Sequence, residues 1–95
     1  MYARHFLRKQ VVITGLGVVS PNGVGCEAFA AACLSGRSGM SRLEGMDTAG
    51  LKSTVAGQVR GFDLESVLPT AELRRGPRMV PLALAASREA LAQAK

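Results

Sequence analysis

The feature that most constrains the fold is an apolar run near the N-terminus. Residues 10–19 read QVVITGLGVV, and their apolar side chains do not alternate with polar ones. A strand of this kind presents apolar side chains on both faces, as strands of parallel sheets do when other layers cover them on both sides. We therefore predict a strand at 10–19 that needs a packed layer on each face.

The C-terminal segment also needs other elements to bury its apolar surface. Its residues 80–95 form the clearest predicted helix. Pro81 suits the first turn of a helix, where its missing N–H donor is tolerated. Two apolar lines run along this helix, one formed by Leu82, Ala85, Ala86 and Ala90 and the other by Leu84 and Leu91. A helix that is apolar nearly all round is buried on more than one side.

The remaining sequence supplies too few helices and strands to bury both the strand at 10–19 and the helix at 80–95. The predicted elements are a turn at 20–23, a helix at about 25–35 that stops at Gly36, an irregular stretch at 36–54, a short strand at 55–60, and a helical turn capped by Asp63 that ends at Pro69. A chain of 95 residues forms one domain at most and buries only about 60–65% of its unfolded surface. We expect an α/β chain that is part of a larger fold.

The net charge of +5 limits the kinds of partner. Much of it lies in two clusters, Arg4, Arg8 and Lys9 at the start and Arg74, Arg75 and Arg78 later. No aromatic residue lies near the second cluster, whereas grooves for single-stranded nucleic acid set aromatic side chains among basic ones. No apolar stretch approaches the ~18 residues that cross a bilayer, and no signal peptide is visible. We expect a cytoplasmic protein that binds neither nucleic acid nor membrane.

The Gly15-Leu16-Gly17 sequence has two interpretations. The first is a dinucleotide loop, but Ser20 stands where that fingerprint has its third glycine, Pro21 follows, and no acidic residue ends a second strand about 20 residues on. The second is a buried strand whose glycines let another element approach its backbone closely. We favour the second interpretation and predict no bound cofactor.

The sequence offers no good metal or nucleophile site. Cys26 and Cys33 are seven residues apart, which places them on one face of a helix and too far apart for a disulfide. No Cys-x-x-Cys occurs, and His5 is too isolated to complete a metal site. We interpret both cysteines as small packing residues.

Several ungapped motifs nevertheless resemble one enzyme family. They are VVITGLGVVSPNG at 11–23, GRSG at 36–39, MDTAG at 46–50, VAGQVRGFD at 55–63 and LALAASREALAQA at 82–94. In this order and with these gaps they are similar to the N-terminal part of β-ketoacyl-acyl carrier protein synthases, and most similar to the elongating enzymes of fatty-acid and type II polyketide synthesis.

This resemblance implies a thiolase-like layered α/β/α/β/α fold with two pseudo-equivalent halves, assembled as a homodimer or a ketosynthase heterodimer. Family members are several times longer than this chain. Residues 1–95 would then be a partial N-terminal domain, incomplete by itself, with residues 1–9 as a basic lead-in.

The family's reaction is a decarboxylative Claisen condensation. A cysteine thiolate takes an acyl group from acyl carrier protein, two histidines polarise the malonyl thioester as it loses CO₂, and backbone donors stabilise the oxyanion. The resemblance places these residues beyond Lys95 and so implies no catalytic residue in this chain. We expect the chain alone to be inactive.

One functional patch is implied within the chain. Arg74 and Arg75 match a basic pair that helps related synthases to dock the acidic acyl carrier protein, and steering by exposed cations suits such a partner. The alternative interpretation of the pair is a solvated basic turn. Gly76-Pro77 replaces a usual Met-Asp, and Ala30 stands where Trp is frequent. Such departures also allow a non-catalytic, chain-length-factor-like protein that binds a carrier protein or a partner synthase.

Overall fold

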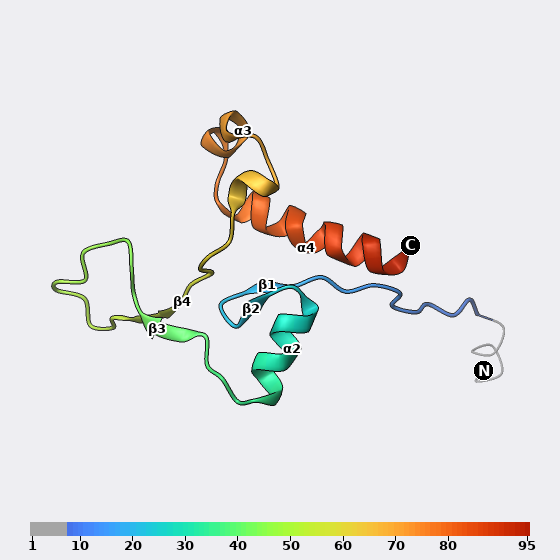
Figure 1. The fold of residues 1–95 in the computed structure, drawn as a ribbon, viewed down its shortest axis with the longest axis horizontal. Coiled ribbons are helices and arrows are strands. Elements are labelled where there is room, and N and C mark those ends of the chain that lie inside the picture. The colour runs from blue at the N-terminus through green and yellow to red at the C-terminus, as the bar shows by residue number, and fades with distance from the viewer. Residues whose placement is uncertain (1–7) are drawn as a thin grey trace.

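The computed structural model describes residues 8–95, which combine helices with short strands (Figure 1). In chain order the elements are β1 (Val19–Ser20), β2 (Gly23–Val24), α2 (Cys26–Leu34), β3 (Met40–Arg42), β4 (Val55–Gly57), the 3₁₀ turn η1 (Leu64–Ser66), α3 (Thr70–Arg75) and α4 (Met79–Ala94). The mixed α/β class is therefore as predicted. His5, Arg4 and most of the basic lead-in lie outside the described residues.

The strands form two separate antiparallel pairs. In the first, Val19 lies opposite Val24 and Ser20 opposite Gly23, so the chain reverses through the predicted turn. The Ser20 hydroxyl donates to the Gly23 carbonyl at 3.0 Å and accepts from the Asn22 N–H at 3.2 Å, which closes this turn. The second pair joins β3 to β4.

The prediction of a strand over 10–19 is wrong for most of its length. Only Val19 of that range lies in a strand, and residues 11–18 join no sheet. Val11 is 94% exposed and Ile13 is 82% exposed. A strand requires a neighbouring strand to bond its backbone, and residues 8–95 provide none for this segment.

Helix α4 packs against this N-terminal segment and runs alongside it in Figure 1. A Cβ built on Gly15 would overlap the carbonyl oxygen of Ala90, and one built on Gly17 would overlap that of Ala86. The two glycines thus admit a helix backbone, which confirms the predicted close approach. The predicted buried strand around them is wrong, because both glycines lie outside any strand and are only half-buried.

Little apolar surface is buried in the described part of the chain. Ala32 on α2 is its one buried hydrophobic side chain apart from Pro81 on α4. Helix α4 has cover on one side only, since Met79 is 68% exposed and Leu91 72% exposed. The radius of gyration is 18.4 Å, whereas a compact domain of this length has about 12 Å. The expected excess of apolar surface is therefore present.

The other predicted elements are confirmed with small changes, and three were missed, namely β2, β3 and α3. Helix α2 and helix α4 lie where expected, β4 is shorter than the predicted strand, and Asp63 caps η1 by accepting from the Glu65 N–H at 3.0 Å. Strand β3 lies within the stretch predicted to be irregular, and α3 was not predicted. Within residues 8–95, no helix has the length and apolar character that crossing a membrane requires.

Candidate functional site

The candidate site is the last turn of α3, which carries Arg74 and Arg75. This helix follows Pro69 and ends where Gly76 adopts an extended conformation. Both arginines are exposed, and cations near the C-terminal end of a helix agree with its dipole. In Figure 1, α3 stands apart from the two strand pairs, so the arginines lie on a projecting part of the molecule.

A carboxylate accompanies this pair. Glu72 Oε1 lies 4.0 Å from Arg75 Nη1, and the two side chains are 55% and 78% exposed. An ion pair this long and this exposed contributes little and leaves the guanidinium available to a partner. The three-residue spacing of Glu72 and Arg75 on a helix was the sequence signal for this contact.

The third arginine of the cluster, Arg78, behaves differently. Its Nη2 donates to the carbonyl oxygen of Val59 at 3.0 Å, a contact between residues 19 positions apart. Arg78 also stands at the N-cap position of α4. The structure therefore separates the cluster into two projecting cations and one cation with a backbone partner.

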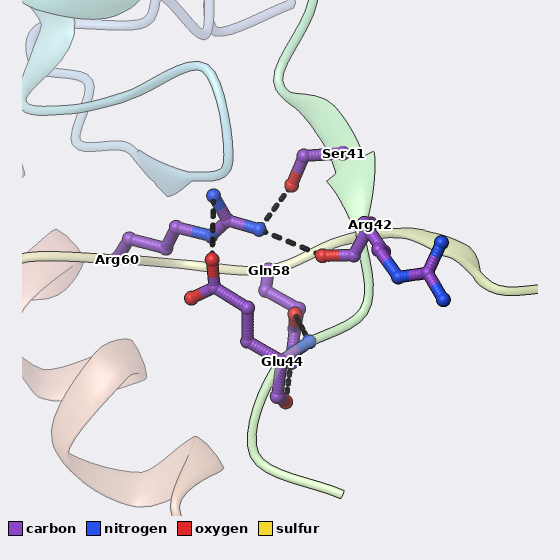
Figure 2. Close-up of polar contacts among 5 residues, drawn as sticks. All are labelled: Ser41, Arg42, Glu44, Gln58 and Arg60. Atoms are coloured by element: carbon purple, nitrogen blue, oxygen red, sulfur yellow. Dashed lines mark hydrogen bonds and ion pairs between the residues drawn. The ribbon is translucent and has the colours of Figure 1, made fainter. Parts of the chain in front are cut away.

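Val59 is followed by a second arginine with fixed partners, drawn in Figure 2. Arg60 donates through Nη2 to the hydroxyl of Ser41 and to the carbonyl of Arg42, the latter at 3.1 Å, and its Nη1 lies 3.4 Å from Glu44 Oε1. Gln58 reinforces the junction, because its side chain accepts from the Glu44 N–H at 2.9 Å and donates to the Glu44 carbonyl at 3.1 Å. Sequence reasoning missed this network, because no local pattern brings residues 41–44 to residues 58–60.

The two cysteines do not form a reactive site. Burial raises the pKa of the Cys26 thiol, the negative charge of Glu89 raises it further, and the thiol donates to the Leu16 carbonyl at 3.3 Å. A protonated thiol is a poor nucleophile. Cys33 is exposed, and both cysteines are free.

Glu89 of α4 joins three parts of the chain. One carboxylate oxygen accepts from the Val18 N–H at 2.9 Å and the other from the Cys26 N–H at 2.8 Å, at the start of α2. These two backbone bonds lower the pKa of Glu89. The neighbouring Gln93 accepts from the Leu16 N–H at 2.8 Å. Sequence reasoning did not identify either acceptor.

No nucleotide or metal arrangement accompanies these contacts in the described residues. The backbone of α4 occupies the space beside Gly15 and Gly17 that a dinucleotide loop would leave for phosphate. Residues 8–95 contain no group of three or more His, Cys, Asp or Glu side chains placed to hold a metal ion. An open depression of about 530 Å³ lies between α2 and Glu89, and it is lined by Val24, Gly25, Glu27, Ala28, Ala31 and Glu89.

Comparison with known proteins gives a consistent result. The sequence model of the family described as "Beta-ketoacyl synthase, N-terminal domain" matches residues 8–95. The chain is 44% identical over 84 residues to the tetracenomycin polyketide synthase ketoacyl synthase beta subunit of Streptomyces glaucescens. It is 34% identical over 84 residues to 3-oxoacyl-(acyl-carrier-protein) synthase 2 of Vibrio cholerae. It is 38% identical over 87 residues to a putative polyketide beta-ketoacyl synthase 2 of Streptomyces coelicolor.

These matches cover 88% to 92% of the chain but only 20% of each relative. The chain thus spans about a fifth of the length of the curated proteins that it resembles.

Proposed function

The chain belongs to the β-ketoacyl synthase family, and from this membership we propose that it forms the N-terminal part of a 3-oxoacyl-acyl-carrier-protein synthase. The observation that carries the proposal is the match of residues 8–95 to the N-terminal domain of that family. The fold proposed for the whole protein is the thiolase-like layered one, in which other layers cover the apolar residues that are exposed here. We propose the cytoplasm as its location on the family resemblance alone.

The proposed activity is chain elongation in fatty-acid or polyketide synthesis. An acyl group moves from carrier protein to an enzyme thiolate, malonyl-carrier protein loses CO₂, and the resulting carbanion attacks the acyl thioester and displaces the thiolate. The raised pKa of Cys26 and its bond to the Leu16 carbonyl argue against that residue as the nucleophile. The contribution proposed for residues 8–95 is therefore structural support and partner docking.

The partner proposed for α3 is the acidic acyl carrier protein. Arg74 and Arg75 are exposed on a projecting helix, and the nearest carboxylate pairs only weakly with Arg75. Exposed cations speed association with an acidic partner and give weak, salt-sensitive binding, which suits a carrier that must leave again.

The test of docking is charge reversal in the complete gene product. Arg74→Glu with Arg75→Glu should weaken binding of the Vibrio cholerae holo-acyl carrier protein about tenfold or more at low salt and flatten its salt dependence, as measured by fluorescence anisotropy. The matched control is Arg37→Glu with Lys52→Glu, which changes the net charge equally at two exposed sites outside α3. Equal affinity for the α3 variant and the wild type would refute docking at this helix.

A second candidate function is a non-catalytic ketosynthase subunit of the chain-length-factor kind. The observation that favours it is the 44% identity to a protein named as a ketoacyl synthase beta subunit. The discriminating experiment incubates the complete gene product with acyl carrier protein that carries an acyl group as a thioester, and looks for the acyl-enzyme by intact mass. A synthase gains the acyl mass by itself, whereas the subunit stays unmodified and co-purifies with a partner synthase.

A further inference from the structure

We propose that Arg78 is a positioning residue that sets the placement of Arg74 and Arg75. Its hydrogen bond to Val59 joins the two ends of the segment 61–77, which contains η1 and α3. We call the three residues at this junction, Val59, Arg60 and Arg78, the neck. The inference deepens the docking function proposed for α3 and rests on it.

The hydrogen bond between Arg78 and Val59 closes the chain between them into a loop. The chain leaves at Val59, passes through η1 and α3, and returns at Arg78, whose guanidinium bonds the Val59 carbonyl at 3.0 Å. The outgoing side is fixed as well, because Arg60 bonds the β3 residues Ser41 and Arg42 and pairs with Glu44 (Figure 2). Both ends of the 61–77 excursion are thus attached to one place beside β3 and β4.

The rest of the excursion has no fully buried side chain, and Leu64, Leu68 and Leu73 are half-buried. Neither η1 nor α3 contains a buried residue. Its local bonds are short-range, such as Leu68 N–H to Leu64 carbonyl at 3.2 Å and Leu73 N–H to Pro69 carbonyl at 3.1 Å. These bonds shape the two turns but do not orient them against the rest of the molecule. The orientation of α3 therefore depends on its attachment at the neck.

The three arginines therefore have different roles. The side chains of Arg74 and Arg75 are exposed to solvent at the end of α3, whereas the guanidinium of Arg78 donates a hydrogen bond to the backbone carbonyl of Val59. Gly76 lies between the pair and Arg78, and a Cβ built on it would meet no atom within 4 Å. Loss of the Arg78 bond should release α3 and weaken docking through Arg74 and Arg75.

The first test measures local order by hydrogen–deuterium exchange in the complete gene product. Arg78→Met should speed exchange of the 61–77 amides about threefold to tenfold, since it removes one charge-assisted bond. Arg78→Lys keeps a charged donor and should restore part of the protection. The control Arg88→Met removes an equal charge from the exposed face of α4 and should leave 61–77 unchanged. Unchanged exchange in Arg78→Met would overturn the proposal.

The second test is a double-mutant cycle on binding of the Vibrio cholerae holo-acyl carrier protein. If Arg78 acts through the pair, Arg78→Met weakens binding about threefold in the wild-type background and has no further effect when Arg74 and Arg75 are already alanine. Additive losses would mean that Arg78 touches the carrier directly, and this would overturn the positioning role.

The two proposals fail in different ways. If Arg74→Glu with Arg75→Glu leaves carrier binding intact, docking at α3 is refuted. A specific rise in 61–77 exchange in Arg78→Met would still support the neck itself.

Discussion

At Gly17 one missing methyl group decides whether α4 can pack against the N-terminal segment. A Cβ there would overlap the Ala86 carbonyl, and the neighbouring Gly15 meets Ala90 in the same way. Both clashes are with helix backbone, which cannot rotate aside as a side chain can. These positions need glycine for lack of space, not for an unusual backbone angle.

Gly17→Ala should destabilise the complete gene product by about 1–3 kcal/mol, because the N-terminal segment and the backbone of α4 must separate. The control is Gly76→Ala, at a glycine with nothing within 4 Å of the added atom and an ordinary φ of −132°. This control should change stability by no more than about 0.5 kcal/mol. Urea denaturation of the three proteins compares them, and equal midpoints for Gly17→Ala and the wild type would contradict the packing.

Glu89 acts at the same junction through its charge. The native state favours its carboxylate, because two backbone N–H groups bond it and lower its pKa. Its stabilisation is therefore complete above the ordinary glutamate pKa of about 4.3 and disappears as pH falls through the lower folded value.

Glu89→Gln should thus make the complete gene product less stable at neutral pH, and the difference from the wild type should shrink as the pH falls below about 4.3. Denaturant midpoints measured across that range test the sign. Glu27→Gln removes an exposed carboxylate from the first turn of α2 and serves as the control. A difference between Glu89→Gln and the wild type that stays constant with pH would show that the carboxylate charge is not involved.

The elements that the sequence pattern predicted correctly are those stabilised by hydrogen bonds within their own segment. Helices α2 and α4 lie where periodicity and capping put them, since the bonds of a helix lie within its own segment. Segment 11–18 failed as a strand because its bonds must come from elsewhere. Strand β3 was missed for the same reason, because Met40–Arg42 has no apolar alternation and exists through its pairing with β4.

The candidate site likewise has a part that could be predicted from the sequence and a part that depends on contacts between distant residues. Resemblance located Arg74 and Arg75, and their exposure agrees with a docking role. Helix α3 could have been predicted, because Pro69 precedes six residues with Glu72 in the first turn and arginines in the last. The contacts of Arg60 and Arg78 could not, since each joins residues 16 to 19 positions apart with no repeating pattern.

Segment 11–15 should become a paired strand when the rest of the synthase is present. The N–H groups of Leu16 and Val18 already bond Gln93 and Glu89 of α4, which leaves the residues before them without acceptors in the described chain. Amides of residues 11–15 should exchange rapidly in the 95-residue chain and at least about tenfold more slowly in the complete gene product. Equal rates in both would refute the predicted pairing.

On the scale of the whole molecule, the described residues have an extended shape with extents of 61 × 35 × 26 Å. Within residues 8–95, thirteen large hydrophobic side chains are exposed, including those of Val11, Leu34, Met79 and Leu91. Fully burying one such side chain contributes about 1.5–3 kcal/mol, so a chain that exposes so many lacks the main stabilising term of a folded domain. This is the physical reason why we propose that the family domain matched by residues 8–95 needs further layers to be stable.

The most direct measurement is small-angle scattering of the isolated 95-residue chain, combined with a thermal melt followed by circular dichroism. The account predicts a radius of gyration well above the value of about 12 Å for a compact domain, or association into larger particles, with no cooperative transition. A monomer near 12 Å that melts cooperatively would contradict it, because these residues would then form a complete core by themselves.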